Sequence, residues 1–205
     1  MSEQLKLPTL GSNIPQRAST KGRLFWENMI RLQGWRLLGE IPNISKAVVI
    51  GAPHTSNMDG VYGIEFALAL GLEVSIMVKE ELYRPPLRGL LDWVNAVPVN
   101  RASATGLVEQ MCEEFIKRDK FWLFIAPEGT RKAATSWKKG FYHIAFAAQV
   151  PIVMLGFDYE RQAEVFLGVF EPTGDYEADL PKILAFYKGL KGGSPENLSL
   201  PLRNL

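Results

Sequence analysis

A histidine and an aspartate stand five positions apart in the stretch PHTSNMD, residues 53–59. Within a regular helix they would point away from each other, because each residue turns the helix by about 100°. His54 and Asp59 can meet only if His54 lies in the turn after a strand and Asp59 in the first turn of the following helix. The carboxylate would then hold one imidazole nitrogen, and the other nitrogen could take a proton from a hydroxyl group.

The same stretch can also be interpreted as a plain helix start. Ser56 has the side chain of a helix cap, and Asp59 stands three positions later, where a carboxylate can accept from the cap residue's N–H. A negative charge in the first turn also suits the helix dipole. On this interpretation His54 is only a loop residue, and the stretch alone leaves both interpretations open.

Neither of two candidate nucleophiles in the chain has a suitable context. Ser56 lacks the G-x-S-x-G pattern of a nucleophile elbow, and Cys112 lies inside an expected helix, where packing is its expected role. If His54 is catalytic, the hydroxyl that it activates therefore belongs to a substrate.

A second polar group lies in FIAPEGTRK, residues 124–132, directly after an apolar run. Glu128 and Arg131 then stand at the end of a strand, which is the usual ligand face of an α/β sheet. Gly129 permits an unusual backbone angle or the close approach of a ligand. The alternative is a surface turn with an internal ion pair of little energetic value.

Apolar runs of strand length alternate with helical patterns along the chain, which predicts an α/β fold. The expected strands cover residues 46–52, 73–79, 95–101, 120–126, 151–159 and 163–170. The expected helices cover residues 22–39, 58–71, 85–94, 102–119, 137–149 and 178–192. Since the last two strands are close enough for a hairpin, we expect a single domain with a mixed central sheet flanked by helices.

The N-terminal region is expected to differ from the domain at residues 41–205. Residues 1–20 are rich in Pro, Ser, Thr, Gln and Asn without periodicity, which is typical of a mobile arm. Residues 21–40 contain an amphipathic helix with a narrow polar stripe. This helix either packs on the domain or lies on a bilayer with its basic residues facing lipid phosphates; the second alternative is favoured here.

Composition excludes several classes of protein. The chain has 205 residues and a formal net charge of +1, which gives no sign of nucleic-acid binding. Two histidines and one cysteine without ligand spacing predict no metal site. No signal peptide and no apolar run long enough to cross a bilayer is visible in the sequence, so we expect a cytoplasmic protein that is soluble or peripheral to the inner face of a membrane.

Four segments, taken together, resemble the conserved motifs of the glycerolipid acyltransferases, which include the lysophosphatidic acid and glycerol-3-phosphate acyltransferases. They occur in the family's order, and the resemblance covers about residues 45–157. The segments are PHTSNMD, AVPVNR, APEGTR and VPIV.

The resemblance implies transfer of a fatty acyl group from acyl-CoA or acyl-carrier protein to the hydroxyl of a lysophospholipid or lysophosphatidic acid, without a cofactor. It makes His54 the general base and Asp59 the residue that orients it. The residues implied to bind the acceptor phosphate and glycerol are Arg101, Glu128, Gly129, Thr130 and Arg131. Lys79, at the end of an expected strand, could also meet a phosphate or could be a solvated lysine.

The motifs depart from the family pattern at three positions. Pro53 precedes the histidine, Asn100 replaces an acidic residue, and Lys132 follows the PEGTR segment. These departures leave the acceptor open. One alternative is an acyltransferase for another lipid or secondary-metabolite hydroxyl, and another is a catalytically idle lipid-binding module.

Overall fold

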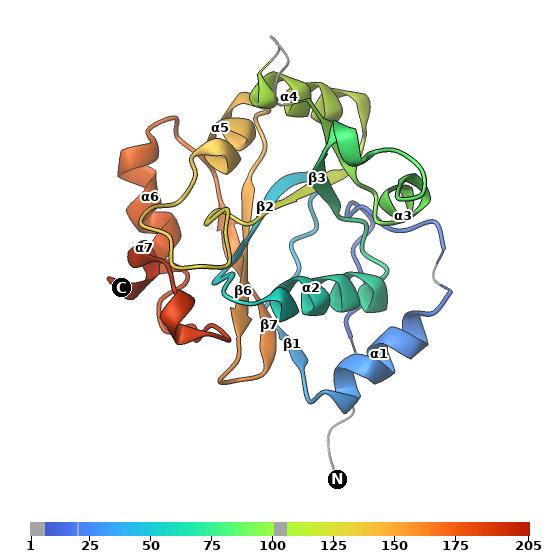
Figure 1. Ribbon diagram of the computed structural model, residues 1–205, viewed down its shortest axis with the longest axis horizontal. Helices are drawn as coiled ribbons and strands as arrows, with labels where there is room; N and C mark the ends of the chain where they lie inside the picture. Colours follow the sequence, from blue (N-terminus) through green and yellow to red (C-terminus); the bar gives the residue numbers. More distant parts are fainter. Residues whose placement is uncertain (1–6, 20, 101–105) are drawn as a thin grey trace.

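The computed structural model describes residues 7–19, 21–100 and 106–205. One sheet of seven strands runs through it in the order β1-β7-β6-β2-β5-β3-β4 (Figure 1). The strands are β1 (Arg36–Leu38), β2 (Lys46–Ala52), β3 (Ser75–Lys79), β4 (Val97–Val99), β5 (Phe121–Ile125), β6 (Ile152–Asp158) and β7 (Ala163–Phe170). Strands β2 to β6 run parallel, whereas β7 pairs antiparallel with β6 and parallel with β1. The predicted mixed α/β sheet and the hairpin at its end are confirmed.

The helices flank this sheet. They are α1 (Arg23–Leu32), α2 (Asn57–Leu70), α3 (Arg88–Trp93), α4 (Leu107–Lys117), α5 (Gly140–Ala147), α6 (Tyr176–Ala185) and α7 (Leu200–Arg203), with short 3₁₀ turns η1 (Glu80–Leu82) and η2 (Pro195–Asn197). No helix in the described ranges is long and apolar enough to cross a membrane.

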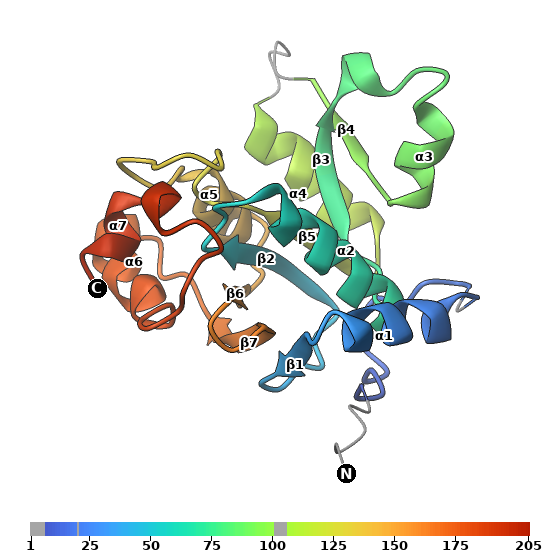
Figure 2. The same ribbon diagram turned by 60° about the horizontal axis from the view of Figure 1, so that its bottom comes forward.

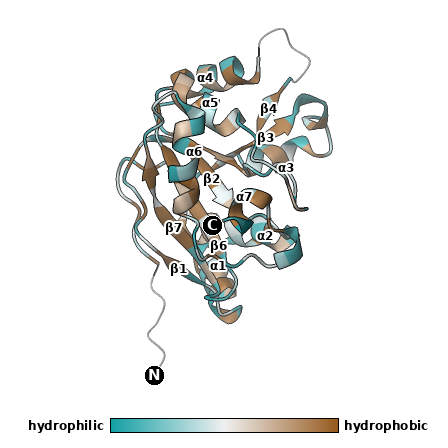
Figure 3. Cartoon of the chain, turned by 90° about the vertical axis from the view of Figure 1, so that its left-hand side faces the viewer, coloured by the Kyte–Doolittle hydropathy of each residue, from teal (hydrophilic) through white to brown (hydrophobic). Residues whose placement is uncertain are grey.

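Alternating residues of the central strand β2 build the two sides of the core, as the pleat of a strand requires. Val48 and Ile50 pack with residues of α4, α5 and α6. Ala47 and Val49 face the other side and pack with Leu70 of α2. Because both faces of β2 are covered, nearly its whole run is buried and apolar, and Figure 3 shows β2, β6 and β7 as largely hydrophobic ribbons.

Helix α1 is shorter than predicted, and the prediction of one helix over residues 22–39 is wrong. Gly34 has a left-handed φ of 77°, and its N–H donates to the Arg31 carbonyl, while the Trp35 N–H donates to the Ile30 carbonyl. These two bonds form a Schellman motif, which ends a helix. The chain then turns into β1 at Arg36, at the edge of the sheet.

The exposed side of α1 keeps much of its apolar character. Its buried residue Ile30 packs with Phe66 and Ala69 of α2, and Figure 2 shows the two helices side by side. In contrast, Leu24, Phe25 and Leu32 are 70%, 58% and 83% exposed. Helix α1 therefore packs on the domain and also presents apolar side chains to its surroundings.

Residues 7–19 form an irregular segment that lies against the domain. Ile14 is 1% exposed and belongs to the same core cluster as Leu70 and Leu72. Gln16 forms an isolated bridge with Leu72. Where the sequence predicts a mobile arm over residues 1–20, the described part is held in place by buried apolar contacts.

Candidate active site

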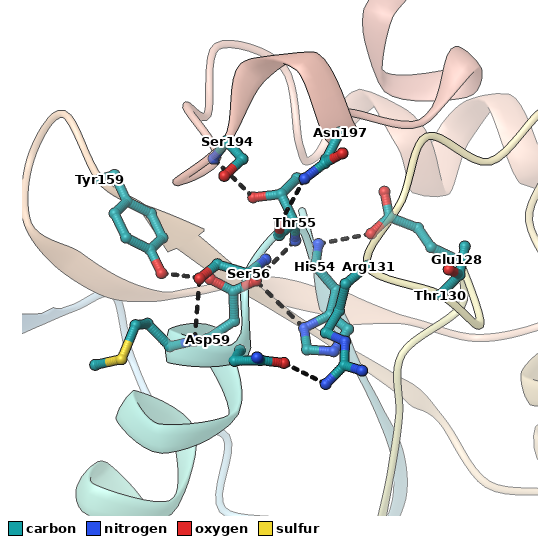
Figure 4. Close-up of polar contacts among 12 residues, drawn as sticks. His54, Thr55, Ser56, Asp59, Glu128, Thr130, Arg131, Tyr159, Ser194 and Asn197 are labelled. Atoms are coloured by element: carbon teal, nitrogen blue, oxygen red, sulfur yellow. Dashed lines mark hydrogen bonds and ion pairs between the residues drawn. The ribbon is translucent and has the colours of Figure 1, made fainter.

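The turn after β2 brings His54 and Asp59 together. β2 ends at Ala52, α2 begins at Asn57, and Asp59 lies fully buried in the first helical turn. The imidazole Nδ1 of His54 lies 3.3 Å from Oδ2 of Asp59 (Figure 4). This is ion-pair distance without the alignment of a hydrogen bond, since Nδ1 makes no hydrogen bond among the described groups. The sequence prediction of a strand–turn–helix context for this pair is confirmed.

Asp59 also forms a capping box with Ser56. The stretch is therefore both a helix start and a contact between His54 and Asp59. Its Oδ2 accepts hydrogen bonds from the N–H groups of Thr55, at 2.7 Å, and Ser56, at 2.8 Å. The Ser56 hydroxyl in turn accepts from the Met58 N–H at 3.1 Å. The carboxylate that starts the helix is therefore fixed in the position where it faces His54.

Tyr159, a residue that the sequence did not point to, completes the surroundings of Asp59. It follows β6, and its hydroxyl donates to Oδ1 of Asp59 at 2.5 Å. Burial, and then this hydrogen bond, raise the pKa of Tyr159. The phenol therefore stays protonated near neutral pH and occupies the oxygen of Asp59 that does not face the imidazole.

Glu128 lies behind His54. Its side chain is 2% exposed, and Oε2 accepts a hydrogen bond of 2.6 Å from the backbone N–H of His54. Burial raises the pKa of the Glu128 carboxyl, and its interactions with Ser199 and the His54 N–H oppose that rise. In this position Glu128 supports the backbone of the histidine loop, whereas the motif resemblance implies that it binds the acceptor.

A polar cleft of about 650 Å³ opens on one side of His54. Gly129, Thr130 and Arg131 of the PEGTR segment line it together with Lys132. Gly129 adopts a left-handed φ of 65°, which favours glycine at this turn. The Arg131 guanidinium donates to the Asn57 side chain, which holds it beside the start of α2 (Figure 4).

The structure does not place the other two predicted binding residues, Lys79 and Arg101, at this site. Lys79 is exposed at the end of β3 and lines neither this cleft nor the apolar cavity described below. Arg101 lies outside the described residues.

The C-terminal part of the chain supports the same loop. The Ser194 N–H donates to the Thr55 hydroxyl at 3.1 Å, and the Asn197 amide donates to the Thr55 carbonyl at 3.2 Å (Figure 4). Asn197 also lines the polar cleft. No local motif in the sequence indicates these contacts, which join positions 139 and 142 residues apart.

An apolar cavity of about 270 Å³ also borders His54. Its walls come from α2, from the sheet, from the C-terminal end of α3 and from the N-terminal segment. The lining residues include His54, Asp59, Gly63, Ile64, Leu68, Ile76, Trp93, Trp122, Phe124, Leu155, Phe157, Glu164 and Phe166. His54 thus lines both the apolar cavity and the polar cleft.

Comparison with known proteins gives this arrangement a family. The model of the family described as Acyltransferase matches residues 35–157, more than half of the chain. The chain belongs to the acyltransferase family. The match spans the His54 turn, the PEGTR segment and most of β6, so the family inferred from the motifs is confirmed.

The acyltransferase fold also appears in a solved structure. The crystal structure of the 1-acyl-sn-glycerophosphate acyltransferase from Thermotoga maritima matches with a TM-score of 0.53 and 22% sequence identity. The match covers 78% of this chain and 72% of that chain. At this identity the likeness supports the fold alone. Among curated proteins, none matches the chain.

Proposed function

We propose that this acyltransferase moves a fatty acyl group from a thioester, acyl-CoA or acyl-carrier protein, to the hydroxyl of a lysophosphatidic acid or related lysophospholipid. The observation that carries the proposal is that His54 lines both an apolar cavity and a polar cleft that also contains Arg131 and Lys132. An acyl chain suits the first and a phosphate-bearing acceptor suits the second. The reacting carbonyl and hydroxyl would then meet at the imidazole.

His54 acts as the general base. Since its Nδ1 faces Asp59, Nε2 is the nitrogen left to take the proton of the acceptor hydroxyl. The hydroxyl oxygen attacks the thioester carbonyl, and the tetrahedral intermediate collapses by breaking the carbon–sulfur bond. The imidazolium returns its proton to the departing thiolate, so the cycle ends with neutral histidine, an ester and a thiol.

The PEGTR segment binds the acceptor and supports the developing oxyanion. A guanidinium can donate two parallel hydrogen bonds to a phosphate, and Arg131 is already held at the cleft by Asn57. The Gly129 N–H donates to the Ala126 carbonyl and is occupied. The N–H groups of Thr130 and Arg131 make no hydrogen bond within the described chain, and they remain as donors for the oxyanion.

The deciding experiment measures transfer of radiolabelled acyl groups from acyl-CoA, and separately from acyl-carrier protein, to a panel of acceptors. The panel holds lysophosphatidic acid, other lysophospholipids, glycerol 3-phosphate and phosphate-free alcohols. We expect phosphate-bearing acceptors to be preferred and His54→Ala to abolish transfer. A preference for phosphate-free alcohols would support the alternative acyltransferase, and an inactive parent protein would support an idle lipid-binding module.

We also propose that α1 attaches the enzyme peripherally to the inner face of a membrane. The exposed Leu24, Phe25 and Leu32 are the side chains that would enter the interface. Changing all three to serine should reduce co-sedimentation with anionic liposomes, whereas Ile116→Ser, an 81% exposed position on α4, should not. Equal reductions would contradict a specific role of α1. Point changes are preferable to removing residues 1–39, because that deletion would also remove β1 and buried Ile14.

A further inference from the structure

One polar side chain in the wall of the apolar cavity has no partner. Glu164 on β7 is 4% exposed and lines the cavity together with aromatic residues such as Phe157 and Phe166. Its Oε2 is buried, and its side chain makes no hydrogen bond or ion pair with any described residue. Buried carboxyl groups normally have such partners, because leaving one unpaired costs free energy.

The neighbouring hairpin shows how another buried carboxylate in this fold finds partners. Asp158, at the end of β6, is 1% exposed, and its Oδ1 accepts from the N–H groups of Glu160 and Arg161. Its Oδ2 makes no hydrogen bond among the described groups, but it lies 3.4 Å from Nε of Arg161, which is ion-pair distance. Glu164 lacks any such arrangement, although it lies on the strand that pairs with β6. Its side chain instead borders the space that a ligand would fill.

The protonation state of Glu164 suits a hydrogen bond to a neutral group. Burial raises the pKa of its carboxyl well above the ordinary value. Burial thus favours the protonated carboxyl, which has an O–H that donates and a carbonyl oxygen that accepts. A hydroxyl group offers the complementary donor and acceptor in one atom, whereas a plain hydrocarbon chain offers neither.

The strand register places Glu164 away from the reacting bond. Glu164 pairs with Phe157 of β6, and β6 separates β7 from β2, the strand that leads to His54. Two strand spacings correspond to roughly 10 Å across the sheet. A group on the substrate that reaches Glu164 would therefore stand several carbons from the thioester carbonyl.

We propose that the apolar cavity takes an acyl chain that carries a hydroxyl group several carbons from the thioester, and that Glu164 recognises this hydroxyl. The inference rests on the proposed function, since it assumes that the acyl chain of the donor occupies the cavity. It makes Glu164 a residue that determines specificity, without a part in bond making or breaking.

The test measures binding directly, without requiring turnover. Palmitoyl-CoA and its monohydroxylated forms, with the hydroxyl beside the thioester, in mid-chain or at the end, are titrated into the protein. Trp93 and Trp122 line the cavity, so their fluorescence reports occupancy. The parent protein is compared with Glu164→Leu, which removes both polar atoms, and with Glu164→Gln, which keeps a donor and an acceptor.

We expect a chain hydroxylated beyond its first carbons to bind roughly five- to tenfold more tightly than palmitoyl-CoA, which is the effect of a buried hydrogen bond. Glu164→Leu should abolish or reverse that ratio, and Glu164→Gln should retain most of it. Equal binding of all chains by the parent protein would overturn the proposal and leave the proposed function intact. If no chain binds, the proposal fails as well, and the transfer assay then decides separately whether the protein is an acyltransferase of another donor.

If Glu164→Leu lowers binding of every chain by the same factor, Glu164 is only structural and the proposal is overturned. If that variant does not fold, the preference of the parent protein and its retention in Glu164→Gln still decide the outcome. Transfer from the hydroxylated and plain donors, measured as kcat/KM, should follow the same order as binding.

Discussion

The hydroxyl of Tyr159 donates a hydrogen bond of 2.5 Å to Oδ1 of Asp59, the carboxylate whose other oxygen faces His54. The phenol and the imidazole therefore lie on opposite oxygens of one buried carboxylate. Thr55 and Ser56 donate to the oxygen on the histidine side. With donors on both oxygens, the carboxylate has little freedom to rotate, which keeps it aimed at the imidazole.

Tyr159→Phe should lower kcat about tenfold while leaving KM for the acceptor nearly unchanged, because a positioning hydrogen bond is lost without any change in the cleft. The measurement is steady-state transfer with varied acceptor. Tyr62→Phe is the matched control, since Tyr62 lies in the same aromatic cluster but stacks on Trp35. Equal effects of the two substitutions would show that the cluster matters only for packing.

Asp59→Asn and Ser56→Ala should separate catalysis from helix capping. Asp59→Asn is expected to reduce kcat by roughly 10²- to 10⁴-fold, since the imidazole loses its carboxylate partner. Ser56→Ala removes the hydroxyl that accepts from Met58, costs about 1 kcal/mol of stability and leaves turnover within a few-fold of the parent. Urea unfolding and transfer kinetics measure the two effects. Similar turnover in both variants would show that Asp59 only caps the helix and has no role in catalysis.

Arg131→Lys should raise KM for phosphate-bearing acceptors about tenfold, because lysine keeps the charge but loses the planar fork. The affinity for the acyl donor should not change. Lys79→Ala serves as the control for a basic residue outside the cleft and should behave like the parent protein. An equal rise in KM for a phosphate-free alcohol would mean that Arg131 acts on the shape of the cleft and does not bind phosphate.

Glu164→Gln should change how stability depends on pH. Burial raises the pKa of Glu164 in the folded chain, so above the unfolded pKa the folded state binds more protons. Stability contributed by this group is present at low pH and falls as pH rises toward the folded pKa, by at most about 1.4 kcal/mol per pH unit. The glutamine variant should therefore gain stability relative to the parent as pH rises from the ordinary carboxyl range toward the raised pKa of Glu164. Glu160→Gln, an exposed neighbour, should show no such gain in urea unfolding.

The sequence is most informative where local pattern and tertiary packing agree. β2 is buried on both faces, so its apolar run predicts the strand with the bounds that the structure has. The edge position of β4 follows from Pro98, which cannot donate to a ladder. The helix predicted over residues 22–39 is too long because Trp35, Leu37 and Leu38 continue its apolar pattern. The left-handed Gly34, which precedes them, ends the helix.

In the candidate site, too, the sequence predicts the local contacts and misses those between distant positions. The contact of His54 with Asp59 is local and depends on one turn, so the spacing of the two residues predicts it. Tyr159 reaches Asp59 across 100 positions, and Asn197 reaches Thr55 across 142. Such contacts depend on how strands and loops are stacked, which no short pattern encodes. Glu164 was missed because a single glutamate in an apolar strand carries no local signal of an empty hydrogen-bond site.

The support of Thr55 by Ser194 and Asn197 also bears on how the enzyme is made. His54 and Thr55 leave the ribosome early, whereas the residues that fix their loop follow 139 and 142 positions later. The loop therefore cannot settle until nearly the whole described chain has been synthesised and has folded back onto it. A nascent chain would thus lack a settled His54 turn until residues 194–197 have been made and have docked on it.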